Sequence, residues 1–206
     1  LQTLNFWDYL SAKKIQVKDA PQWDKKLKSL KARVLHVDEM TRDNYKLTLE
    51  GGKLIDSQGN VFDTKDHTTQ FSGPGWAIYV VNAKGELFAY THTYGEFHHS
   101  SFLGGAPVKA AGEFVVVDGK VLVITGKSGH YIPTPKIVKA YVKELHAAGA
   151  MHKDATAQLA FDGVFFRVAE LVVKGKRRPL DAATFLAHLP AFAKNTTANK
   201  SYESDY

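Results

Sequence analysis

The middle of the chain alternates apolar and polar residues with a period of two, which is the pattern of half-buried β-strands. Three such stretches each surround a turn signal: Gly51-Gly52, the tetrapeptide NAKG, and Asp118-Gly119. Each combination predicts an antiparallel hairpin, and Asp-Gly is the strongest turn signal of the three. The predicted strand and loop segments are 45–56 (YKLTLEGGKLID), a turn and strand at 57–62 (SQGNVF), a polar loop at 65–75 (KDHTTQFSGPG), 76–91 (WAIYVVNAKGELFAYT), 114–125 (FVVVDGKVLVIT), and a last hairpin or strand-rich segment at 158–173 (QLAFDGVFFRVAELVV).

Toward both ends of the chain, apolar residues recur at helical spacing. Thr134 can cap a helix that has Pro135 in its first turn and Gly149 as its stop, so 134–149 predicts a helix. Its buried stripe is expected to be Ile137, Val138, Tyr141, Val142 and Leu145. The other expected segments are 3–12 (a short helix or extended anchor), a helix opened by Asp19 and Pro21 and running to Val34, and a helix capped by Asp181 and bent near Pro190.

These elements predict an α+β fold, with a central, mainly antiparallel sheet of hairpins and helices on its N- and C-terminal sides. At 206 residues the chain is long enough for one good-sized domain, and we expect residues 1–194 to form it. The remaining residues, 195–206 (NTTANKSYESDY), have almost nothing apolar to bury, which predicts a disordered tail.

Composition and charge narrow the chemistry. The chain has no cysteine, which excludes disulfides, thiolate metal sites and cysteine nucleophiles. Its net charge of +6 favours a nucleotide, another anionic substrate or an acidic protein target. No apolar run approaches the ~18 residues of a membrane span, so we expect a soluble protein without membrane contact. The start at Leu1 favours a processed product or a domain cut from a longer protein, secreted or delivered as part of it.

The segment 97–133 collects the side chains best suited to chemistry. FHHSSFLGGAPVKAAGE (97–113) joins histidines and serines to a glutamate, and SGHYIP (128–133) adds a histidine and a tyrosine. Histidine is the usual proton carrier near neutral pH. If 114–125 is a hairpin, Glu113 at its mouth lies close to the SGHY loop that follows it. We therefore expect one site at an end of the sheet, with catalytic Glu113, His98 and His130 and substrate-binding His99, Ser100, Ser101, Ser128 and Tyr131.

The same segment is also compatible with purely structural roles, and two kinds of site are disfavoured in it. Histidines and serines in tight loops can satisfy buried backbone groups without any chemistry. A zinc site of His98, His99 and His130 is disfavoured because adjacent histidines usually point apart and no HxH or HxxxH spacing occurs, so we expect no metal. No G-x-S-x-G elbow surrounds Ser100 or Ser101, and the chain holds no P-loop or GxGxxG.

The motif pair FHHSSFLGGAPVKAAGE and SGHYIP resembles the conserved domain of the plant IQM (IQ-motif calmodulin-binding) proteins and related fungal and bacterial toxin-like domains. The likeness extends over residues 3–150 and leaves 151–194 as a C-terminal extension. In plants, the resemblance implies a calcium-signalling adaptor. Two departures limit it. Ile132 stands where the family has an arginine after SGHY, and Ile15-Gln16 lacks the spaced arginines of an IQ motif, so calmodulin binding is not implied.

Three functional hypotheses follow. The first is a toxin or effector enzyme that uses NAD as an ADP-ribosyltransferase, since cleavage of the nicotinamide–ribose bond needs a carboxylate, polar groups on the ribose and an aromatic ring. Glu113, His98 with Ser100, and Tyr131 are those residue types. The second is a metal-independent ribonuclease with His98 or His99 and His130 as base and acid. The third is a non-catalytic, IQM-like interaction module.

Overall fold

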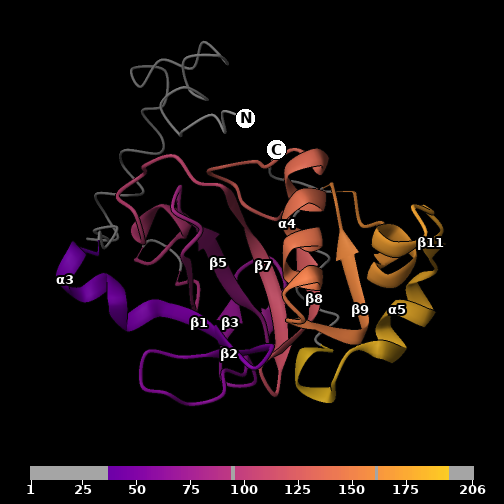
Figure 1. Cartoon of the computed structure of the whole chain (residues 1–206), viewed down its shortest axis with the longest axis horizontal. Helices are drawn as coiled ribbons and strands as arrows, with labels where there is room; N and C mark the ends of the chain where they lie inside the picture. The colour runs from indigo at the N-terminus through magenta and orange to yellow at the C-terminus, as the bar shows by residue number, and fades with distance from the viewer. Residues whose placement is uncertain (1–36, 94–95, 161, 195–206) are drawn as a thin grey trace, which may run out of the picture.

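The computed structural model describes residues 37–93, 96–160 and 162–194. Its centre is a nine-stranded sheet with the order β11-β10-β9-β8-β7-β5-β6-β1-β2, in which every neighbouring pair is antiparallel except β8 and β9 (Figure 1). The predicted α+β class and the mainly antiparallel sheet are thus confirmed.

The strands of this sheet are β1 (Lys46–Glu50), β2 (Lys53–Ile55), β5 (Ala77–Val81), β6 (Leu87–Tyr90), β7 (Ala110–Val117), β8 (Lys120–Thr125), β9 (Met151–Gln158), β10 (Phe165–Arg167) and β11 (Pro179–Leu180). The α-helices are α3 (Glu39–Arg42), α4 (Pro135–Ala147) and α5 (Ala182–His188), and the short 3₁₀ and π turns are η2 (Asp43–Tyr45), η3 (His99–Ser101), η4 (Ala169–Val173) and η5 (Ala191–Ala193).

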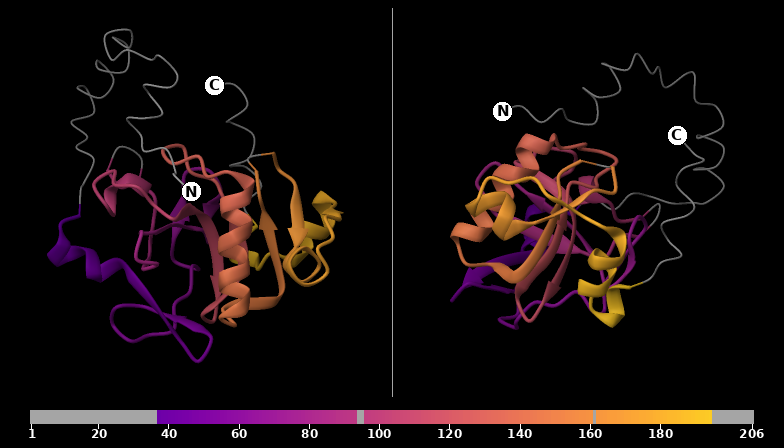
Figure 2. Two further views of the ribbon diagram at one scale, coloured as in Figure 1. Left: turned by 45° about the horizontal axis from the view of Figure 1, so that its top comes forward. Right: turned by 90° about the vertical axis from the view of Figure 1, so that its right-hand side faces the viewer.

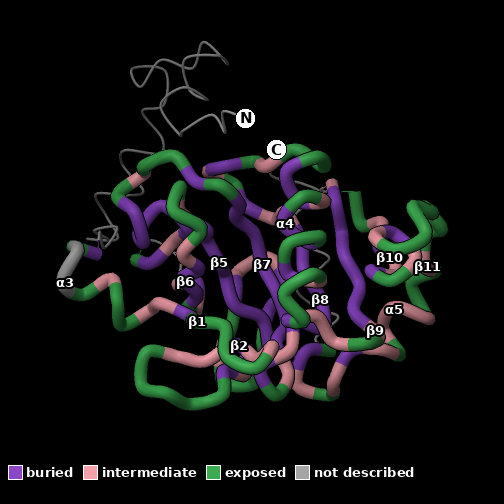
Figure 3. The backbone as a smooth tube through the Cα atoms, in the orientation of Figure 1, coloured by how far each residue is buried: buried purple, intermediate pink, exposed green. Residues whose placement is uncertain are grey.

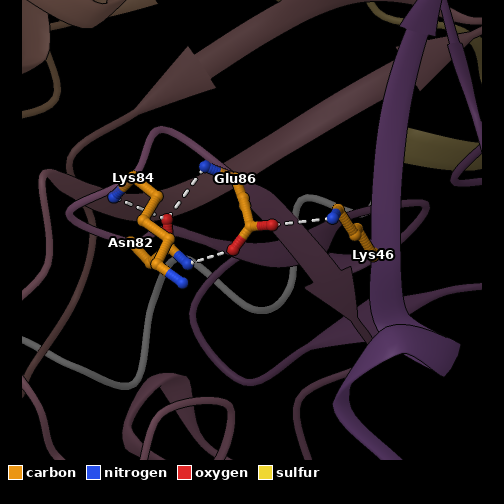
Figure 4. Close-up of polar contacts among 4 residues, drawn as sticks. All are labelled: Lys46, Asn82, Lys84 and Glu86. Carbon is orange, nitrogen blue, oxygen red and sulfur yellow. Dashed lines mark hydrogen bonds and ion pairs between the residues drawn. The ribbon is translucent and has the colours of Figure 1, made fainter. Parts of the chain in front are cut away.

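The three predicted hairpins are present, and each turn forms for a local reason. Gly51 and Gly52 have φ angles of 56° and 75°, and Asp118 and Gly119 have 48° and 75°, as turns between right-twisted strands require. In the β5–β6 turn, the side-chain oxygen of Asn82 accepts the backbone N–H groups of Lys84 and Glu86 at 3.0 and 2.9 Å (Figure 4). These turn residues set the strand register along the middle of the sheet.

Helix α4 crosses from the end of β8 to the start of β9, which is why these two strands run parallel. Thr134 caps the helix by accepting the N–H of Ile137, and Pro135 occupies its first position. The predicted stripe is confirmed in full, because the buried residues of the helix are Ile137, Val138, Tyr141, Val142 and Leu145. The parallel pair itself was not predicted.

The structure corrects four of the expected boundaries. The last strand pair begins at Met151 instead of Gln158, and the end of the expected hairpin is the π-helix η4. The polar loop 65–75 contains two short paired strands, β3 (Thr68–Thr69) and β4 (Gly73–Pro74). The expected strand at 57–62 is reduced to a single bridge between Ile55 and Val61. The cap at Asp181 is confirmed, but the helix ends at His188; the expected continuation bent near Pro190 is instead the separate turn η5.

Three apolar clusters hold the domain together. The largest fills the space between the sheet and α4, and includes Tyr79, Phe114 and Val142. A second lies under the 97–131 segment, and a third packs α5 and η5 against Trp76 and Val123. In the right panel of Figure 2, α4 and α5 lie on opposite sides of the sheet, and Figure 3 shows the central strands as the most continuously buried part of the chain.

The expected helices at 3–12 and 19–34 and the expected tail at 195–206 lie outside the described residues. Within the three described ranges, no helix combines the length and the apolar content that crossing a bilayer would take.

Candidate functional site

The HHSS motif forms the 3₁₀ turn η3, with His98 as its N-cap. The backbone N–H of His98 donates to Ser101 Oγ at 2.9 Å, and the N–H of Ser101 donates to the His98 carbonyl at 2.9 Å. Ser101 is therefore fully buried and closes the turn on itself. The adjacent histidines point to different partners, since His99 Nε2 donates to the Gly112 carbonyl at 2.8 Å, which ties the turn to β7.

His98 belongs to a cluster of three imidazoles, with His92 six residues before it and His130 from the SGHYIP turn. Its Nδ1 lies 2.7 Å from His92 Nε2, and its ring lies 5.5 Å from the ring of His130. The backbone N–H of Gln70 donates to His92 Nδ1, so a neutral His92 carries its proton on Nε2 and donates to His98. Hydrogen bonds are thus donated in one direction, from Gln70 to His92 and from His92 to His98.

Glu113 lies in the interior of β7, because this strand begins at Ala110. As expected, Glu113 sits at the mouth of the β7–β8 hairpin, whose pairing ends at Phe114 and Ile124, but it does not start the strand. It pairs with Ile78 of β5, and its side chain is completely buried. Ser72 donates to its Oε2 at 2.5 Å, and Oε1 is buried without a hydrogen-bond partner. A glutamate in this position is held by the interior of the sheet and is not an exposed edge charge.

The electrostatic surroundings of Glu113 come from the loop 69–72 and from Lys127. Burial raises the pKa of the Glu113 carboxyl to about 7, against the lowering effects of the Ser72 hydrogen bond, the Lys127 charge, the Thr69 hydroxyl and the Phe71 N–H. Lys127 Nζ lies 3.3 Å from Ser72 Oγ. Burial lowers the pKa of Lys127, and the Glu113 charge opposes that change. The loop 69–72 therefore connects the two groups: Thr69 and Ser72 contact Glu113, and Gln70 contacts His92.

The SGHYIP motif forms a turn beside this cluster. Ser128 Oγ accepts the N–H of Tyr131 at 3.3 Å, and the Ser128 carbonyl accepts the N–H of Ile132 at 3.1 Å. The Tyr131 hydroxyl donates to the Ala106 carbonyl at 3.1 Å, which ties the SGHYIP turn to the loop after η3. Ile132 is half exposed and has φ of 39°, a strained conformation for a β-branched residue.

The structure brings together most of the predicted site and adds three residues to it. His98, His130 and His99 lie around His92, and Glu113 joins them through the loop 69–72. The sequence pattern did not single out His92, Ser72 or Lys127 as site residues. His92 directly follows a predicted strand and is one of four histidines close in sequence, which was a usable signal. Ser72 had no signal of its own, because only the pairing of β3 with β4 brings its loop over β7. Lys127 lies just past β8, in the stretch that the predicted hairpin already places beside Glu113.

Burial makes these histidines poor bases. It lowers the pKa of His92 and of His98 to about 4, with nearby imidazoles adding to the effect, and that of His99 to about 3. Burial also lowers the pKa of His130. All four are therefore neutral at pH 7. Within the part of the chain that the structure describes, no group of three or more histidine, aspartate or glutamate side chains could hold a metal ion.

Replacing Glu113 with glutamine tests this electrostatic account. A buried carboxyl with a raised pKa stabilises the fold fully below the unfolded value and loses that contribution as pH rises through about 7. We expect the free energy of unfolding of Glu113→Gln, relative to that of the unchanged protein, to be about 2–3 kcal/mol higher at pH 8 than at pH 5. Urea unfolding at both pH values measures the gain, with Glu144→Gln on the exposed side of α4 as the control. A difference that does not change with pH would contradict a buried carboxyl of raised pKa.

Comparison with known proteins locates the family resemblance. The family model of the IQ motif-containing protein middle domain matches residues 41–138, a narrower span than the 3–150 expected from the motifs. IQ domain-containing protein IQM5 of Arabidopsis thaliana is 33% identical over 109 residues, which is 53% of this chain and 21% of that protein. IQM1 is 30% identical over 112 residues (54% and 22%), and IQM3 is 35% identical over 101 residues (49% and 22%), both from Arabidopsis thaliana. No solved structure matches the chain significantly.

The matched segment contains both motifs, η3, most of the sheet and the start of α4. It spans about a fifth of the length of these relatives, and none of the three is named as a toxin or a transferase. Residues 41–138 therefore match the IQM middle-domain model, and the chain is distantly similar to the Arabidopsis IQM proteins over about half of its own length.

Proposed function

We propose that this chain acts as a non-catalytic interaction module, in which the two family motifs build the domain instead of performing a reaction. The burial of Glu113 carries this proposal. An ADP-ribosyltransferase needs a carboxylate that contacts the ribose or the acceptor. Glu113 is fully buried between β5 and β8, with Ser72 covering one of its oxygens. A ligand would have to displace the loop 69–72 to reach it.

The other motif residues support the same proposal. Ser101 closes η3, and Ser128 closes the SGHYIP turn. His99 and Tyr131 donate to backbone carbonyls, at Gly112 and Ala106. The two serines thus close local turns, while His99 and Tyr131 join separate segments of the chain. A motif whose polar groups are engaged in this way explains a shared fold without requiring a shared reaction.

One observation favours a second function, that of a metal-independent ribonuclease. The rings of His98 and His130 are 5.5 Å apart and only partly buried, which is a geometry that a base and an acid could use on RNA. Their lowered pKa values argue against it, because a general acid at pH 7 must carry a proton. A metal-independent ribonuclease is therefore the alternative to test beside the NAD-using transferase.

One set of assays separates the three functions. Purified protein, together with Glu113→Gln, His98→Ala and His130→Ala, is incubated with NAD and separately with RNA. We expect no consumption of either substrate above the level of the His98→Ala protein. NAD turnover that falls about a hundredfold in a folded Glu113→Gln protein would replace the proposal with a transferase. RNA cleavage that His98→Ala or His130→Ala abolishes would replace it with a ribonuclease.

A further inference from the structure

A groove lies at the β1 end of the sheet. It is formed by the start of β1, the end of β6 and the loop that follows β2. One cavity of about 330 Å³ contains Tyr90 and His67, and a neighbouring cavity of about 400 Å³ contains Asp43 and Thr48. Both are lined by Asn44, Lys46, Ser57 and Gln58, so the two cavities adjoin and together make up the groove. Figure 3 shows much of the loop after β2 as exposed.

One wall of the groove is a continuous row of rings. Tyr45 and Tyr90 lie 4.9 Å apart between ring centroids, Tyr90 and His67 lie 6.0 Å apart, and His67 and Phe62 lie 5.3 Å apart. Tyr90 is 41% exposed, and Val61, which also lines the groove, is 44% exposed. Exposed aromatic faces in a hollow attract the alkyl stems of lysine and arginine and, through the ring quadrupole, their charged ends.

The charge of the groove is opposite to that of the whole chain. Four aspartates line it (Asp43, Asp56, Asp63 and Asp66) against two lysines, Lys46 and Lys65, on a chain of net charge +6. Lys46 Nζ binds Glu86 Oε1 at 2.7 Å, as Figure 4 shows, so its charge is already neutralised. Asp66 and Asp63 also lie near His67, since their charges raise its pKa against the larger lowering effect of burial.

We propose that this groove binds a basic peptide segment of a partner protein, with a lysine or arginine side chain against Tyr90 and His67 and its charge facing Asp63 and Asp66. The inference rests on the proposed function as an interaction module and names the surface that makes the contact. The second cavity adds Asp43 to the acidic lining, so acidic side chains extend beyond the space that contains Tyr90 and His67, which favours a peptide over a single small cation. Charge complementarity between groove and ligand would set both orientation and association rate.

Fluorescence anisotropy at low ionic strength tests the proposal on the full chain. The probe is a labelled, capped heptapeptide with lysines at alternate positions, and its matched control has norleucine in place of each lysine. We expect only the lysine peptide to bind. Asp66→Lys reverses an exposed charge in the groove and should weaken binding about fivefold or more, whereas Lys65→Glu should tighten it. Glu144→Lys makes the same change of charge on α4 and should leave binding unaltered.

The outcomes that contradict the proposal can be told apart, because each overturns a different part of it. Absence of lysine-peptide binding, or binding that Asp66→Lys and Glu144→Lys weaken equally, overturns the assignment to this groove. Binding of free spermidine as tight as that of the peptide overturns the choice of a peptide as occupant. Melting curves of the variants check that each is folded. Because NAD and RNA turnover are measured separately, failure of the groove in a protein without turnover leaves the interaction module standing, while turnover would remove the proposed function itself.

Discussion

Replacing Gly112 with alanine is expected to prevent stable folding. A Cβ atom at this position would lie 1.8 Å from the carbonyl oxygen of Thr125 and 2.8 Å from its carbonyl carbon. Both are backbone atoms of the adjacent strand β8, so relief requires β7 and β8 to separate. The Thr125 oxygen also accepts the Tyr79 hydroxyl at 3.0 Å, and the Gly112 carbonyl accepts His99 Nε2, so a shift breaks two further contacts. We expect a loss above ~4 kcal/mol, which a denaturant titration measures.

A second motif glycine is the matched control for this substitution. At Gly129 in the SGHYIP turn, the nearest atom to an added Cβ is Phe71 Cζ at 3.8 Å, an ordinary contact, and φ lies outside the left-handed region. Gly129→Ala should therefore change the free energy of unfolding by less than ~1 kcal/mol. Equal stability of the two variants would show that the close approach of β7 to β8 does not exist in solution.

Local signals in the sequence were enough to predict most of the sheet. Each hairpin combines alternating strands with a turn that needs a positive φ, and Gly52 and Gly119 have that conformation. The helix α4 was predictable down to its buried stripe because Thr134, Pro135 and Gly149 mark its two ends. In these cases every interaction that decides the element is close in sequence.

The missed features depend on contacts that are distant in sequence. The residues 151–157 (MHKDATA) lack a strong strand pattern, and they become a strand because α4 delivers them beside β8. Glu113 was expected where the strand begins, but pairing with β5 extends β7 back to Ala110, and the carboxylate is buried. Ser72 reaches Glu113 across 41 positions of sequence, and no local pattern reports such a contact.

The neutral histidines make the domain sensitive to acid, and melting temperatures at pH 7 and pH 5 should show it. In the unfolded chain a histidine takes up its proton near pH 6.5, whereas burial holds the pKa of His92 and His98 at about 4 and that of His99 at about 3. Their stabilising contribution is therefore complete above about pH 6.5 and is lost as pH falls toward those lower values. Glu113 acts in the opposite direction, since its raised pKa favours the fold at low pH, but it is one group against several.

Keeping His99 alone neutral in the fold should lower the free energy of unfolding by roughly 2 kcal/mol at pH 5. His99→Gln keeps a donor for the Gly112 carbonyl and should flatten the pH dependence. A melting temperature that is equal at both pH values, or an equal slope in His99→Gln, would show that these imidazoles are not held neutral by burial.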